Sequence, residues 1–239
     1  MNDEKYLPAA VWTFPDVILL FIGGIAGSLI FGTVAALVNG GEVGGVPFLL
    51  ASSVGQALAI LGILNYMSRN RGTASWDLDF GFRFEARDAL GLLYGAGLQI
   101  AVAFLVTLPL IWLLGIEEPE QDVTAIAGEA SSLAARIGVV VMVVVIAPLT
   151  EELVYRSVLL SRLRRGLGVH AAVATAALVW AGVHLVDFDA APFIPGLFVI
   201  GLVLGYQALR TNRIGLAIMT HAGVNLLAAI AILFDLDIG

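Results

Sequence analysis

Two adjacent glutamates stand directly after a long apolar run in this sequence. Residues 137–147 read IGVVVMVVVIA, and residues 148–156 continue as PLTEELVYR. An ionisable side chain at membrane depth is costly in free energy, and it usually faces a cavity or marks a functional site. Glu151, Glu152 and Arg156 are therefore the first candidates for chemistry.

Helical spacing predicts different roles for the two glutamates. Glu152 and Arg156 are four residues apart, so they share one face of a helix and can form an ion pair. Glu151 is turned by about 100° from Glu152 around the helix axis. We expect Glu152 to be neutralised and structural, and Glu151 to be free to face a cavity as a general base.

Two of the three histidines lie in apolar segments beside a second side chain of interest. His184 closes the stretch WAGVH, one turn after Trp180, and His221 opens HAGVN, one turn before Asn225. A buried histidine next to an asparagine is costly unless both face water, a substrate or a metal. The third histidine, His170, is expected at the membrane interface without a chemical role.

Each of these three sets has a structural alternative. The glutamates and the arginine could form a buried salt bridge, and either histidine could be a hydrogen-bond partner between two helices. All three sets occur in order on three helices of one small protein, and this combination favours a functional site.

The composition requires a membrane protein. Of the 239 residues, 59% are hydrophobic and 13% are charged, and the mean hydropathy is +0.96. A soluble domain is about half apolar and a quarter charged. Runs of about 20 apolar residues match the thickness of the hydrocarbon core. We predict an all-α, polytopic membrane helix bundle that forms a single domain over residues 1–239, with a catalytic core at about 137–230. Seven spans are predicted, at residues 16–38, 46–67, 88–114, 137–165, 169–185, 192–209 and 214–234.

Charge and cysteine content exclude several functions. The net charge of -7 offers no basic surface for nucleic acid. Because the chain has no cysteine, it has no disulfide framework, no thiolate metal site and no cysteine nucleophile.

The cations predict how the chain crosses the membrane. Eleven of the twelve lysines and arginines fall on one side of a seven-span arrangement, and Arg136 falls on the other. By the positive-inside rule the N-terminus is cytoplasmic and the C-terminus is outside. We expect a multi-pass protein of a prokaryotic plasma membrane. Two glycine pairs with four-residue spacing, Gly91/Gly95 and Gly201/Gly205, predict close packing of helices.

Three motifs together resemble the CPBP family of intramembrane proteases, which includes CAAX prenyl endopeptidases of the Ras-converting type and bacteriocin-processing or immunity enzymes. EELVYR matches the family's paired glutamates with an arginine, HAGVN matches its His-x-x-x-Asn, and WAGVH matches its aromatic-x-x-x-His, with Trp where Phe is commoner. The segment DLDFGFR looks like the family's upstream linker. The resemblance covers roughly residues 77–230.

The resemblance implies a role for each residue of the three motifs. Glu151 would activate the attacking water with assistance from His184. His221 and Asn225 would polarise the scissile carbonyl and stabilise the oxyanion. Glu152 and Arg156 would hold the geometry of the site. The implied substrate is a peptide, or the C-terminus of a prenylated or hydrophobic protein, reached from the membrane lipids.

A metal ion is the open point of this interpretation, because the family is often labelled as metalloprotease. The sequence has no HExxH helix of the zincin kind. Glu151, His184 and His221 could in principle form a three-ligand zinc site. We favour a metal-free mechanism in which a glutamate-activated water attacks beside a His/Asn oxyanion site.

The depth of the candidate residues raises one difficulty. Counted from the cytoplasmic ends of upright helices, His221 lies about 10 Å deep, near Glu151, whereas His184 lies about 20 Å deep. Tilted helices would close part of this gap. Alternatively, residues 186–192 dip into the bilayer and do not reach the outer surface.

The leading hypothesis is an intramembrane endopeptidase whose site opens to the cytoplasmic side. A second hypothesis is a non-catalytic membrane immunity or scaffold protein of the same family. A third is a proton-coupled transporter that uses Glu151 and Glu152 as a relay. The lack of a detectable inverted repeat counts against the transporter.

Overall fold

The computed structural model describes residues 11–116, 130, 132–186 and 188–234, and in these ranges the regular structure is helical. The acidic connection at 117–129, Lys5, Asp187 and the C-terminal residues 235–239 lie outside the described residues. The predicted all-α fold class is therefore confirmed for the part of the chain that is described.

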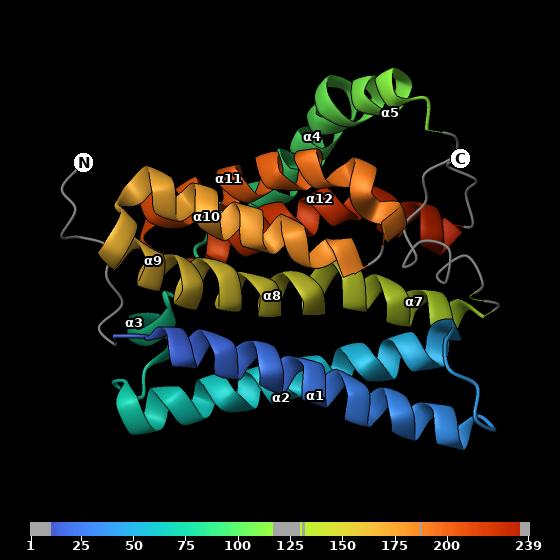
Figure 1. Cartoon of the computed structure of the whole chain (residues 1–239), viewed down its shortest axis with the longest axis horizontal. Coiled ribbons are helices and arrows are strands. Elements are labelled where there is room, and N and C mark those ends of the chain that lie inside the picture. The colour runs from blue at the N-terminus through green and yellow to red at the C-terminus, as the bar shows by residue number, and fades with distance from the viewer. Residues whose placement is uncertain (1–10, 117–129, 131, 187, 235–239) are drawn as a thin grey trace.

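Figure 1 shows most of the helices as long, roughly parallel rods, with α4 and α5 running obliquely to the others. The first two rods are α1 and α2, and the next is built from η2, α4, η3 and α5. The following rod is nearly continuous from α7 to α9, and the remaining helices pack beside it. The bounds are α1 Phe14–Val38, α2 Gly45–Arg71, α3 Trp76–Phe80, η2 Ala86–Ala89, α4 Leu90–Val102, η3 Ala103–Thr107, α5 Leu108–Leu114, α7 Leu133–Val141, η4 Met142–Ile146, α8 Ala147–Glu152, η5 Leu153–Leu159, α9 Leu160–Leu167, α10 Val169–Gly182, η6 Val183–Val186, η7 Phe188–Phe193, α11 Ile194–Thr211 and α12 Gly215–Phe234.

Six helices of the described chain are long and apolar enough to cross a membrane. They correspond to six of the seven predicted spans. The remaining predicted span is the apolar helix Val169–Leu185, which is shorter than these six. At 1.5 Å per residue its 17 residues measure about 25 Å, less than the roughly 30 Å of the hydrocarbon core. The protein is therefore a multi-pass helical membrane protein whose fifth apolar helix is short.

Glycine allows two pairs of helices to approach closely, as the sequence predicts. A Cβ atom at Gly95 of α4 would overlap the carbonyl oxygen of Thr220 in α12. A Cβ atom at Gly201 of α11 would lie 2.9 Å from Cβ of Ala177 in α10. Real Cβ atoms do not approach this closely, so both positions require glycine.

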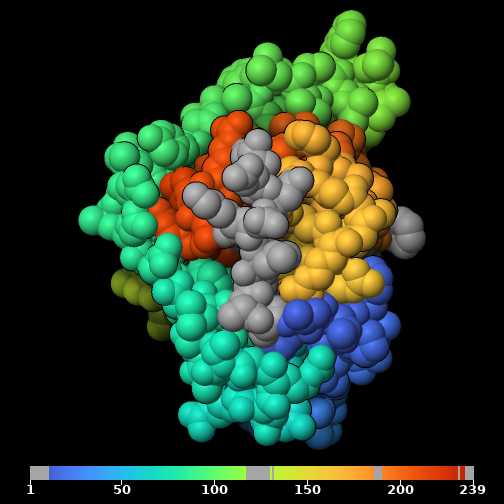
Figure 2. Space-filling model, turned by 90° about the vertical axis from the view of Figure 1, so that its left-hand side faces the viewer, coloured from blue at the N-terminus to red at the C-terminus, as the bar shows by residue number. Residues whose placement is uncertain are grey.

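The second half of the third rod stands away from the rest of the bundle. Helix α4 packs along α12, but α5 buries no residue of its own. Figures 1 and 2 show α5 at the edge of the molecule from two directions. Trp112 of α5 is 84% exposed, which is expected for a side chain that faces lipid.

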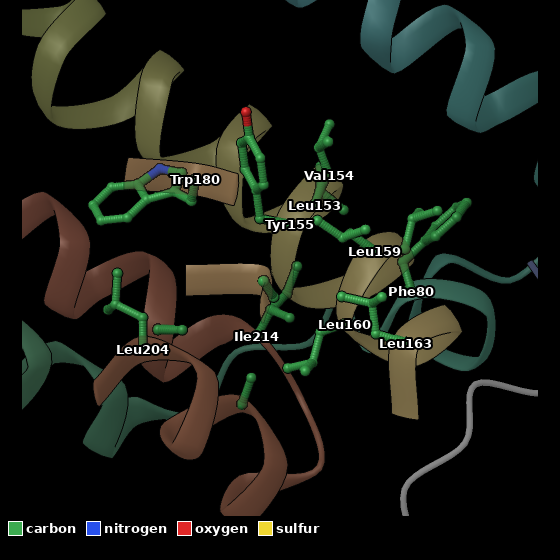
Figure 3. Packing of buried hydrophobic residues seen from close by; sticks show 14 of the residues in the cluster. Phe80, Leu153, Val154, Tyr155, Leu159, Leu160, Leu163, Trp180, Leu204 and Ile214 are labelled. Atoms are coloured by element: carbon green, nitrogen blue, oxygen red, sulfur yellow. The ribbon is translucent and has the colours of Figure 1, made fainter. Parts of the chain in front are cut away.

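The core of the bundle surrounds the fourth rod. Figure 3 shows buried residues of η5 and α9 packed with residues of neighbouring helices. Leu153 and Leu160 are fully buried, as are Leu204 of α11 and Ile214 before α12. The helix that carries the paired glutamates is therefore held on several sides by apolar side chains.

One end of the bundle is tied together by arginines. Arg71 at the end of α2 forms an ion pair with Asp16 at the start of α1, and Arg213 forms one with Asp88 of η2. Nη1 of Arg165 in α9 donates to the carbonyl of Trp12 at 3.3 Å. Figure 2 views this end of the molecule. The clustering agrees with a shared side for these cations, and which side of the membrane they face stays a prediction.

Three segments of the described chain form π-helix, which is rare and often marks functional sites. Two of them, η4 and η5, lie directly before and after α8. Because α8 carries Glu151 and Glu152, the backbone on both sides of the paired glutamates departs from regular α-helix.

Candidate active site

Glu152 is fully buried and forms an ion pair with Arg156. Its side chain is 0% exposed, and its Oε1 lies 3.1 Å from Nη1 of Arg156. The same Oε1 lies 2.9 Å from Nδ1 of His221 on α12. The ion pair predicted from the four-residue spacing is therefore confirmed. The contact with His221 is an addition that links α8 to α12.

Glu151 has a different environment from its neighbour. Its side chain is 28% exposed, and its Oε2 accepts a hydrogen bond from the indole Nε1 of Trp180 on α10. Oε2 also lies 3.9 Å from Nε2 of His221, which is longer than a direct hydrogen bond. Among the described residues no donor reaches the other oxygen, Oε1. The division into one sealed and one accessible carboxylate agrees with the helical spacing.

Trp180 lies at the centre of the candidate residues. It is 1% exposed, and its ring centre lies 5.3 Å from that of His184 and 5.3 Å from that of His221. Cζ of Arg156 lies over the same ring, 4.6 Å from its centre, which is a cation–π arrangement. The sequence reasoning did not place Trp180 in the site. Its aromatic position in WAGVH was the available signal.

His184 joins the site through Trp180. Its Nδ1 lies 2.9 Å from the carbonyl oxygen of Trp180. A carbonyl oxygen only accepts, so Nδ1 carries the hydrogen and, in the neutral ring, Nε2 carries the lone pair. The depth gap counted from upright helices does not separate the two histidines, since both rings contact the same indole. The chain at His184 has already left α-helix for the 3-10 turn η6.

Asn225 lies one turn after His221 on α12, as predicted. Its Nδ2 donates to the carbonyl of Val143 at 2.8 Å. Val143 belongs to the π-helical segment η4. An amide group has two N–H donors, so one hydrogen of Asn225 is engaged by η4 and the second is left for another acceptor.

His170 lies apart from this group. Its Nδ1 pairs with the hydroxyl of Tyr206 at 2.8 Å, which joins the start of α10 to the end of α11. The prediction that it has no chemical role is not tested by this contact.

The residues predicted as possible metal ligands do not form a metal-binding group. Within the described ranges, no three histidine, aspartate or glutamate side chains are arranged to hold a metal ion. Nε2 of His221 lies 3.9 Å from Oε2 of Glu151, and Nδ1 of His184 is directed to a backbone carbonyl, which leaves the lone pair on Nε2 of that ring. A mechanism without a metal ion stays a prediction.

Five side chains from three helical rods close into a ring of contacts. Glu151 meets Trp180, which lies against Arg156, and Arg156 meets Glu152. Glu152 then meets His221, and Nε2 of His221 faces Glu151 again. Two carboxylates, a guanidinium, an imidazole and an indole are thus held together between α8, η5, α10 and α12. Such a set can abstract a proton and stabilise a developing negative charge.

Comparison with known proteins identifies the region that carries this ring. Residues 133–227 match the family described as type II CAAX prenyl endopeptidase, Rce1-like. No curated protein and no solved structure matches the chain. The matched region begins with α7 and ends two residues after Asn225, so it contains all six predicted site residues. Residues 133–227 are therefore a domain of the Rce1-like type II CAAX prenyl endopeptidase family, in agreement with the resemblance carried by the three motifs.

Proposed function

We propose that this protein is an intramembrane endopeptidase that hydrolyses a peptide bond with a water molecule activated by Glu151. The observation that carries the proposal is the contrast between the two glutamates. Glu152 is fully buried and contacts both Arg156 and His221. Glu151 is 28% exposed, and no hydrogen-bond donor among the described residues reaches its Oε1. A general base must be accessible to its substrate, and Glu151 meets this condition.

The first step is the attack of water. Glu151 accepts a proton from the water through Oε1, and the water oxygen attacks the carbonyl carbon of the scissile peptide bond. Nε2 of His184 accepts a hydrogen bond from the same water, because Nδ1 of His184 is committed to a carbonyl. The C–N bond then breaks, and the proton held by Glu151 passes to the leaving nitrogen.

The oxyanion of the tetrahedral intermediate needs hydrogen-bond donors. Asn225 supplies the amide hydrogen that the carbonyl of Val143 does not use. His221 donates through Nε2 when it is protonated on both nitrogens, with its Nδ1 hydrogen directed to Glu152. Fixed donors of this kind are worth about 3 kcal/mol of activation free energy each.

The charges of the ring support this assignment. Glu152 and Arg156 form an ion pair inside the ring, so they bring no net charge to the site. When Glu151 takes up the proton, the negative charge moves to the oxyanion, and the net charge of the site does not change. A site of low dielectric favours a reaction that keeps its net charge constant, because isolated charges are costly there.

The proposed substrate is a membrane-associated peptide, such as the C-terminus of a prenylated or hydrophobic protein. The family name and the position of the ring between apolar helices support this class. We further propose that the site opens to the cytoplasmic side, because the positive-inside rule places the arginine-rich end there.

The test uses the full chain in detergent and a quenched fluorescent peptide with a prenylated cysteine three residues before its C-terminus. Glu151→Gln keeps the shape of the side chain and removes the base, and we expect no cleavage from a folded protein. The matched control is Glu42→Gln, the same chemical change at an exposed position between α1 and α2, which should cleave like the parent. Equal cleavage by Glu151→Gln and the parent would overturn the mechanism.

A non-catalytic role would give a different result. If Glu151→Gln and His221→Ala both retained the biological activity of the parent in cells, the protein would act as a membrane scaffold or immunity factor. Substrate uptake by proteoliposomes would instead indicate a transporter.

A further inference from the structure

Among the described residues, the indole of Trp180 is the one group that donates a direct hydrogen bond to the side chain of Glu151. Its Nε1 donates to Oε2 of the carboxylate. The ring is 1% exposed, so this N–H has no access to bulk water and depends on the carboxylate as its acceptor. A phenylalanine would fill similar space but has no donor.

The position of the indole is fixed from several sides. A Cβ atom at Gly201 of α11 would lie 3.1 Å from Cε3 of the ring, so the absence of a side chain there makes room for it. On another side the guanidinium of Arg156 lies 4.6 Å from the ring centre. Because the backbone carbonyl of Trp180 also holds Nδ1 of His184, the same residue positions two of the groups that the proposed mechanism uses.

We propose that Trp180 is a positioning residue of the hydrolytic site, which holds Oε2 of Glu151 so that Oε1 is directed to the attacking water. This inference rests on the proposed function. A free carboxylate can rotate and present either oxygen, whereas a carboxylate with one oxygen bonded to a rigid, buried donor presents the other.

The kinetic test compares Trp180→Phe with the parent on the prenylated fluorescent peptide. A hydrogen bond to a charged group is worth about 1.5–3 kcal/mol, so we expect kcat to fall by roughly 10- to 100-fold. KM should stay within about twofold, because Trp180 is fully buried and acts through Glu151 rather than on the substrate.

The matched control is Trp12→Phe. Trp12 is also 1% exposed, and its Nε1 also donates a hydrogen bond, at 3.1 Å, to the backbone carbonyl of Asp79 outside the site. Both substitutions remove a buried indole N–H, and both should lower thermal stability. We expect the loss in kcat for Trp180→Phe and not for Trp12→Phe.

A second measurement needs no substrate. The chain has four tryptophans, so selective ¹⁵N labelling gives four indole N–H signals, and Trp180→Phe assigns the one of interest. In Glu151→Ala the Trp180 signal should move, because its charged acceptor is lost, while the Trp12 signal should stay.

The outcomes separate the two proposals. If Glu151→Gln abolishes cleavage and Trp180→Phe cleaves with the kcat of the parent, the positioning role is wrong and the proposed function stands. If Glu151→Gln cleaves normally, the mechanism and the positioning role that rests on it are both wrong. If the parent does not cleave the peptide, the indole signal tests the contact between Trp180 and Glu151. An unchanged Trp180 signal in Glu151→Ala overturns the contact itself.

Discussion

Nδ1 of His221 lies 2.9 Å from Oε1 of Glu152, so the buried glutamate of the pair holds the imidazole that faces its accessible neighbour. This contact gives Glu152 a role on two helices at once. It balances Arg156 on its own rod and fixes the orientation of a ring on α12. A carboxylate–histidine pair of this kind sets which nitrogen of the ring is turned to the site.

Glu152→Gln is expected to destabilise the protein far more than Glu151→Gln. The substitution leaves the guanidinium of Arg156 buried at 1% exposure without its counter-charge. Breaking a buried ion pair in this way costs about 3–5 kcal/mol. Glu151 is partly exposed, and its isosteric change should cost about 1 kcal/mol or less. Thermal unfolding of both variants in detergent checks the difference, and equal midpoints would contradict the assignment of Glu152 as structural.

Asn225→Ala is expected to lower kcat by roughly 10²- to 10³-fold, which is the cost of losing one oxyanion donor. KM should change little, because the donor acts on charge that develops in the transition state. Steady-state kinetics on the fluorescent peptide measures both. Asn70→Ala at the exposed end of α2 is the control and should match the parent. A rise in KM with constant kcat would instead make Asn225 a substrate-binding residue.

Gly95→Ala is expected to separate α4 from α12. The new methyl group would overlap the carbonyl oxygen of Thr220, and overpacking of this kind costs about 1–3 kcal/mol. Gly97 is the control on the same helix, since a Cβ atom there meets nothing within 4 Å. The thermal midpoint should fall for Gly95→Ala only. A similar fall in the midpoint for Gly97→Ala would mean that alanine destabilises helix α4 itself, and that the contact with α12 is not the cause.

The orientation of the chain can be tested with single cysteines, because the protein has none. Glu42 and Asn70 are exposed near opposite ends of α2. With a cytoplasmic N-terminus, Glu42→Cys should react with a membrane-impermeant maleimide on intact cells, and Asn70→Cys should react only after lysis. The reverse pattern would place the arginine-rich end outside and would contradict a site that opens to the cytoplasm.

Much of the fold could be predicted because the physical signals are local. Runs of apolar residues fix where membrane helices form, and the described helices lie close to the predicted spans. The Glu152–Arg156 pair followed from four-residue spacing alone. The glycine pairs also indicated contact surfaces, because a missing side chain permits close approach at a definite place.

The contacts between helices could not be predicted, because they depend on how the helices are rotated and tilted against one another. A local sequence pattern does not determine these angles. Trp180 could have faced lipid or a neighbouring helix, and its contact with Glu151 exists only because α10 turns that face to α8. The same holds for the choice of Glu152 over Glu151 as the partner of Nδ1 of His221. The outward course of α5 also has no counterpart in its apolar sequence.

Two π-helical segments flank α8, and they make the site depend on the number of residues in the fourth rod as well as on the types of its side chains. A π-helical turn accommodates a longer hydrogen-bonded loop than an α-helical turn, so each segment resembles a tolerated insertion. Deleting one residue from the regular α-helix of α8 ahead of Glu151, where no extra residue is absorbed, would rotate Glu151 and Glu152 by about 100° relative to the helix before them. Their partners on α10 and α12 would not follow that rotation. Related chains that keep the site should therefore vary in side chains along this rod while conserving its length between Met142 and Leu159.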